Sequence, residues 1–127
     1  MNAVAPALGV PAATVQLHVA DLTLDLIFRR ASRAGRRLTL HPREWDVLVY
    51  FAWNRNRPIT VAELRRNVWE VDHDPQTNSV AVHISRLRDA VDRDFDQPLI
   101  HTIRRGALGN FYLFTDQPEV LGAWGNA

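Results

Sequence analysis

The chain of 127 residues contains no cysteine, no lysine and a single methionine. The absence of cysteine excludes disulfide bonds and thiolate metal sites, and it fits a reducing, cytoplasmic compartment. No apolar run approaches the ~20 residues of a membrane span, so we expect no membrane partner. Residues 1–14 lack a basic region and are interrupted by Pro6 and Pro11, which is typical of a flexible tail or linker rather than a signal peptide.

The net charge is only +1, but its distribution is uneven. Residues 1–69 carry ten arginines against five acidic residues, whereas residues 70–96 carry three against seven. A hydrophobic fraction of 46% and four tryptophans are enough for a real core, and the length fits one domain. We place this domain at residues 15–115. A weakly patterned tail follows over residues 116–127, whose Trp124 either packs onto the domain or is disordered.

Residues 15–40 predict short β-strands. Apolar and polar residues alternate over 15–19 and again over 22–25. Ala34-Gly35 predicts a tight turn, after which residues 36–40 return as a strand. We therefore expect an antiparallel meander of about four strands.

A helix is predicted to follow. Pro42 suits a first helical turn, and apolar residues then recur with helical spacing at Trp45, Leu48, Val49, Ala52 and Trp53. Asn56 suits the left-handed conformation that ends a helix, and Pro58 cannot extend it.

A second helix is predicted from its capping box. Thr60 and Glu63 have the spacing of that motif. Leu64 and Val68 then face inward, and Trp69 lies at the end of the helix.

Residues 77–92 predict a third helix with two faces. At about 100° per residue, Val80, Ile84, Leu87 and Val91 fall on one stripe. Roughly opposite lie Asn78, Val82, Ser85, Arg86, Asp89 and Arg93. Arginine can bond guanine through two hydrogen bonds and a small apolar side chain can contact the thymine methyl group, so the second face suits a DNA major groove. The pattern also fits an ordinary amphipathic helix.

The three helices predict one core, made of Trp45, Leu48, Leu64, Val68, Val80, Ile84 and Leu87. Residues 99–104 and 111–114 then predict two strands, joined by a turn that contains Gly106 and Gly109. Strands, three helices and a hairpin in this order predict an α+β fold, a winged helix-turn-helix.

The chain resembles the effector domain of OmpR/PhoB-type response regulators over about residues 15–114. The segments that carry the resemblance are LTLHPREWDVLVYFA, ITVAELRRNVW, NSVAVHISRLR and LIHTIR. The resemblance implies a cytoplasmic transcription regulator of a two-component phosphorelay that binds double-stranded DNA. It implies no enzymatic activity, no cofactor and no metal.

The resemblance also implies roles for individual residues. Base reading falls to Arg86, Val82, Ala81 and Ser85. Contacts to the DNA backbone fall to Asn78, His83, Arg88, Trp69 and Thr102. The wing would offer Arg104 to the minor groove, and Arg105, on the opposite side of the strand, would be left to reach a phosphate or water. Phosphate contacts set register whereas base contacts specify sequence.

Two protein partners are implied in the same way. The acidic loop with Glu70, Asp72 and Asp74 is where the family touches RNA polymerase, although a solvated connector fits it equally well. A second copy of the domain on an adjacent half-site is the other expected partner.

The chain departs from the family pattern at four places. His41 replaces a capping threonine, and Arg55-Asn56 replaces Pro-Gly after the first helix. Asp89 lies near the middle of the groove-facing stripe, where it either repels phosphate or accepts a hydrogen bond from cytosine. The wing is several residues longer and carries Leu108 at its tip. We find no doubly wound pattern of a receiver domain, which fits either an excised effector domain or a single-domain regulator.

Other functions find less support. Asp72-His73-Asp74 resembles a metal triplet, but adjacent loop residues rarely converge on one ion, and a helix start before Pro75 is simpler. No nucleophile elbow or phosphate-binding glycine loop is present. The main alternative is a winged helix that binds protein rather than DNA, which the acidic residues 70–96, Asp89 and Leu108 favour.

Overall fold

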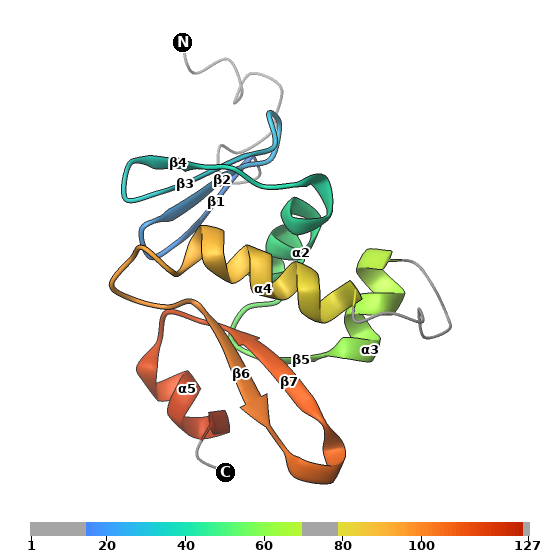
Figure 1. Ribbon diagram of the computed structural model, residues 1–127. Helices are drawn as coiled ribbons and strands as arrows, with labels where there is room; N and C mark the ends of the chain where they lie inside the picture. The colour runs from blue at the N-terminus through green and yellow to red at the C-terminus, as the bar shows by residue number, and fades with distance from the viewer. Residues whose placement is uncertain (1–14, 70–78, 126–127) are drawn as a thin grey trace. The chain divides into compact units, whose positions relative to one another are not determined.

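The computed structural model describes residues 15–69 and 79–125. The chain divides after Thr39 into two compact units. The first unit contains strands, and the second contains helices with a small sheet (Figure 1).

The first unit is the predicted antiparallel meander. Its strands follow in the order β1 (Gln16–Val19), β2 (Leu22–Asp25), β3 (Arg30–Arg33) and β4 (Arg36–Leu38). Between β3 and β4, Ala34 and Gly35 both have positive φ, at 52° and 78°. Such φ values are what a two-residue hairpin turn needs to match the twist of its strands, so the predicted turn is confirmed.

The second unit begins with the helices α2 (Pro42–Trp53), α3 (Val61–Leu64) and α4 (Ser79–Val91). A π-helical turn η2 (Arg65–Trp69) continues α3. The wing consists of β6 (Ile100–Arg104), a 3₁₀ turn η3 (Gly106–Leu108) and β7 (Asn110–Phe114). All seven residues of the predicted helical core are buried, which confirms that core.

The buried face of α2 differs from the predicted one. Val47 and Phe51 are fully buried, whereas Trp53 is 56% exposed. The helical spacing predicts Trp53 on the same apolar stripe as Trp45, and this prediction is wrong. Trp53 lies eight residues after Trp45, which rotates it by about 80° from that position. Phe51 instead stacks on Phe114, with ring centroids 5.9 Å apart.

A third strand joins the wing. The strand β5 (Pro58–Thr60) pairs with β7, so the sheet order is β5-β7-β6. The sequence predicts only the hairpin β6–β7, because Pro58 and Thr60 indicate a helix end and a helix cap. Pro58 is compatible with β5 because proline, which lacks an amide donor, is tolerated on an edge strand.

A helix α5 (Pro118–Gly125) follows the wing, where the sequence predicts a weakly patterned tail. Trp124 lies in this helix with 41% of its surface exposed. The helix contacts β6, so the wing has a neighbour beyond its own sheet.

Candidate nucleic-acid interface

Helix α4 separates its two predicted faces cleanly. Val80, Ile84, Leu87 and Val91 are buried. The four predicted base-reading residues are all exposed: Ala81, Val82, Ser85 and Arg86. Val82 is 43% exposed, so an apolar side chain lies on the solvent-facing side of α4. Asp89 is exposed on the same helix. Asn78 and the predicted polymerase-contact residues Glu70, Asp72 and Asp74 lie outside the described residues.

Trp69 lies at the end of η2, between an arginine and a histidine. Its ring meets that of His83 edge-on, with centroids 5.6 Å apart. The Arg43 guanidinium lies 5.1 Å from the Trp69 ring centroid, and its Nη1 donates a hydrogen bond to the Val68 carbonyl at 2.6 Å. Two predicted backbone contacts, Trp69 and His83, are therefore adjacent.

Arg43 was not predicted to belong to this site. Its role depends on a contact with residues of a different helix, and no local spacing reports such a contact. By bonding the end of η2 and stacking on the indole, Arg43 limits the orientations that Trp69 can adopt.

A second pair of predicted backbone contacts also meets. Nη2 of Arg88 on α4 donates a hydrogen bond to Oγ1 of Thr102 on β6. The Arg88 guanidinium lies 6.0 Å from the ring centroid of Tyr112, the cross-strand partner of Thr102. Burial raises the pKa of Tyr112, while the charges of Arg88 and Arg104 act to lower it. The positive charges of Arg88 and Arg104 therefore both act on the Tyr112 side chain.

An open groove of about 700 Å³ runs along β6. Arg88, Thr102 and Arg104 line it, with Pro118, Leu121 and Gly122 of α5 also contributing. Its lining includes two arginines and no acidic residue. The groove therefore offers a positively charged path between the end of α4 and the wing.

The two wing arginines differ in their surroundings. Arg104 is exposed at the end of β6. Arg105 donates a hydrogen bond from Nη2 to the Trp124 carbonyl at 2.8 Å. In the turn after them, Gly106 and Gly109 have φ of 59° and 84°, a region that favours glycine. The predicted turn glycines are thus confirmed.

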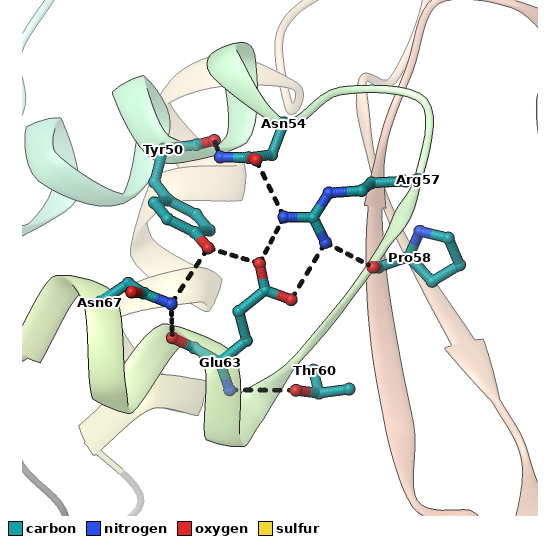
Figure 2. A network of polar contacts seen from close by, with 7 residues as sticks. All are labelled: Tyr50, Asn54, Arg57, Pro58, Thr60, Glu63 and Asn67. Atoms are coloured by element: carbon teal, nitrogen blue, oxygen red, sulfur yellow. Dashed lines mark hydrogen bonds and ion pairs between the residues drawn. The ribbon is translucent and has the colours of Figure 1, made fainter.

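A polar network fixes α3 against α2 and holds η2 in place (Figure 2). The Glu63 carboxylate accepts hydrogen bonds from Arg57 Nη1 at 3.1 Å and Nη2 at 2.5 Å, and from the Tyr50 hydroxyl. The Glu63 amide donates to Thr60 Oγ1 at 3.0 Å, which confirms the predicted cap. The sequence does not reveal Tyr50 and Arg57 as partners of Glu63.

The ionisable groups of this network shift one another's pKa values. The hydrogen bonds from Arg57 lower the pKa of Glu63, against the opposing effect of burial. Burial and the Glu63 carboxylate raise the pKa of Tyr50. Asn67 also donates to the Tyr50 hydroxyl at 3.2 Å, so the network extends to η2, which ends in Trp69.

Within residues 15–69 and 79–125, the structure offers neither a cluster of metal ligands nor a membrane-spanning helix. No group of three or more histidine or acidic side chains there could hold a metal ion. No helix in those ranges is long and apolar enough to cross a bilayer. The triplet Asp72-His73-Asp74 is outside the described part of the chain.

Comparisons with known proteins are consistent with this geometry. Residues 35–107 match the family model described as transcriptional regulatory protein, C terminal. The chain is 36% identical to the transcriptional regulatory protein CusR of Escherichia coli over 89 residues, covering 70% of this chain and 39% of CusR. It is 33% identical to the DNA-binding response regulator MtrA of Mycobacterium tuberculosis over 90 residues, covering 71% of this chain and 40% of MtrA.

The fold is similar to solved DNA-binding domains. The RstA DNA-binding domain of Klebsiella pneumoniae, solved in complex with the RstA box, superposes with a TM-score of 0.68 at 27% identity. That superposition covers 80% of this chain and 98% of the RstA domain. The superposition confirms the predicted winged helix. The chain spans about two fifths of the length of CusR and of MtrA. The chain belongs to the family of transcriptional regulatory protein C-terminal domains, the effector domains of OmpR/PhoB type.

Proposed function

We propose that this domain binds double-stranded DNA sequence-specifically as the effector domain of a transcription regulator. The exposed face of α4 carries the proposal, because it presents Val82 and Arg86 side by side with small residues while the opposite stripe is buried. A helix of this kind fits the major groove. The names of CusR, MtrA and RstA support the same function.

Each contact has a proposed role. Arg86 bonds a guanine, Val82 and Ala81 contact thymine methyl groups, and Ser85 bonds a neighbouring base edge. Phosphate contacts are assigned to His83, Trp69, Arg88, Thr102 and, from the resemblance, Asn78. The meeting of Arg88 with Thr102 supports this division, because one DNA strand could follow the groove that both residues line.

The wing completes the proposed interface. Arg104 extends from the exposed end of β6 and would enter the minor groove. Two further parts of the proposal rest on the resemblance. They are a contact of Glu70, Asp72 and Asp74 with RNA polymerase, and a second copy of the domain on an adjacent half-site.

Selection from a randomised duplex library tests the function directly. We expect enrichment of a defined site, and the affinity for it should fall linearly in log–log form with salt because counterions are released. The recovered duplex and a scrambled duplex would be titrated by fluorescence anisotropy. Failure to enrich any sequence, with binding insensitive to salt, would refute DNA recognition and favour a protein-binding module.

A further inference from the structure

The wing tip is a short turn that two backbone hydrogen bonds close at the end of the β6–β7 ladder. The Arg105 amide donates to the Gly109 carbonyl, and the Gly109 amide donates to the Gly106 carbonyl, each at 3.0 Å. A Cβ built on Gly106 or Gly109 would meet no atom within 4 Å. The turn therefore projects into open space, where a contact with another element would further restrict its orientation.

Helix α5 supplies such a contact, and it is firmly attached at its start. The buried Thr115 precedes α5, and its hydroxyl donates to the Asn56 side chain at 2.7 Å. The same hydroxyl accepts a hydrogen bond from the Gln117 amide at 3.0 Å. Gln97 donates from its side chain to the Asp116 carbonyl at 2.9 Å.

From this anchor α5 follows β6 toward the wing tip. Its first residue, Pro118, lines a small cleft with His101, and Leu121 and Gly122 line the groove that continues to Arg104. Eight helical residues extend about 12 Å, and five strand residues about 17 Å. The helix is therefore about two thirds as long as β6, and Figure 1 shows it lying beside that strand.

At the wing tip, Arg105 connects the turn to helix α5. Its guanidinium bonds the carbonyl of Trp124, in the last turn of α5. Carbonyls in the last turn of a helix have no partner within the helix, and a cation there interacts favourably with the helix dipole. Arg105 therefore joins the end of α5 to the turn, whereas its neighbour Arg104 stays exposed.

We propose that α5 and Arg105 form a brace that orients the wing, so that Arg105 is a positioning residue and Arg104 is the arginine that reaches DNA. This inference rests on the proposed DNA-binding function. It assigns the C-terminal helix to the DNA-binding machinery, although the family model ends at residue 107.

Hydrogen exchange in the free protein tests the brace without DNA. The variant Arg105→Ala and a chain that ends at Gln117 should both exchange the amides of residue 105 and of Gly109 about five-fold faster relative to their intrinsic rates, the effect of losing one hydrogen bond. Arg37→Ala, which removes an exposed arginine from β4, should leave these amides unchanged. Unchanged exchange in Arg105→Ala would overturn the brace, even if the shortened chain failed to fold.

DNA titration then separates positioning from contact. Using the duplex that selection recovers, both variants should weaken binding about five-fold, and combining them should cause no further loss because both break one contact. The loss should fall on the preference for A·T-rich flanks and spare discrimination within the major-groove site. Arg105→Lys, which keeps a donor, should restore part of the affinity.

Two results of the DNA-binding experiments would refute the brace or the proposed function. A shortened chain that binds DNA as well as or better than the full chain, with Arg105→Ala still weakened, would make Arg105 a DNA ligand and refute the brace. A chain that selects no duplex would refute the proposed function, while the exchange experiment would still decide whether α5 holds the wing.

Discussion

The substitution Glu63→Gln should destabilise the domain by about 1 kcal/mol. Glutamine keeps the shape of the side chain and one acceptor oxygen, so the variant loses charge rather than packing. Hydrogen bonds to charged groups contribute about 1.5–3 kcal/mol and neutral ones about 0.5–1.5 kcal/mol. The Arg57 side chain is 44% exposed, so solvent screening brings the estimate to the low end of that difference.

Thermal unfolding followed by circular dichroism would measure the effect. For a domain of this size, the expected loss corresponds to a decrease in Tm of about 3–6 °C. Glu119→Gln makes the same chemical change at an exposed position of α5 and should alter stability by less than about 0.5 kcal/mol. A double-mutant cycle with Arg57→Gln should recover most of the loss as coupling between the two side chains.

The pH dependence of the stability difference between the wild type and Glu63→Gln tests whether the Glu63 charge is responsible. The pKa of Glu63 is lowered in the folded state from the ordinary value of 4.5, first of all by its hydrogen bonds with Arg57. The carboxylate therefore contributes stability above the unfolded pKa, and this contribution is lost as pH falls through the folded pKa. The difference between the wild type and Glu63→Gln should be constant from about pH 6 to 8 and shrink below about pH 4.5. A difference that persists unchanged to pH 3 would refute the assignment of the stability to the charge.

Three DNA-binding predictions follow from the exposed face of α4 and from the wing. Arg86→Ala should weaken binding to the selected duplex by about 1–3 kcal/mol and relax discrimination at one base pair; equal weakening on scrambled duplex would make Arg86 a phosphate contact only. Asp89→Ala should strengthen binding to scrambled duplex by relieving repulsion of phosphate, and an unchanged anisotropy titration would place Asp89 away from DNA. Arg104→Ala should weaken binding most on duplexes with A·T-rich flanks, whose narrow minor groove attracts arginine, and a loss independent of flank sequence would contradict a minor-groove contact.

The spacing of apolar and polar residues predicts the meander and the helices because both depend on contacts between residues that are near in sequence. The strands β1 to β4 pair in chain order, and the stripe of α4 buries the residues that its period indicates. Thr60 caps α3 as its spacing predicts.

The features that escaped prediction depend on contacts between distant segments. Pro58 and Thr60 carry helix-boundary signals, and only the arrival of β7 makes this segment a strand. Arg43, Tyr50 and Arg57 look like ordinary surface residues until another helix or turn is placed beside them. The contact of Arg105 with the end of α5 could not be predicted either, because nothing near Arg105 in sequence indicates it.

The strand β5 gives the domain a particular order of assembly during synthesis. Each strand of β1 to β4 pairs with the one made just before or after it, so this sheet needs no segment that follows Leu38 in the chain. Pro58 instead pairs with Leu113, and a pairing so distant in the chain must wait for closure of a long loop. Until Asn110 to Phe114 emerge, Phe51 and Ile59 lack the aromatic strand that buries them in the finished domain. A nascent chain stalled before that strand would therefore expose apolar surface, which would make it a substrate for chaperones and proteases.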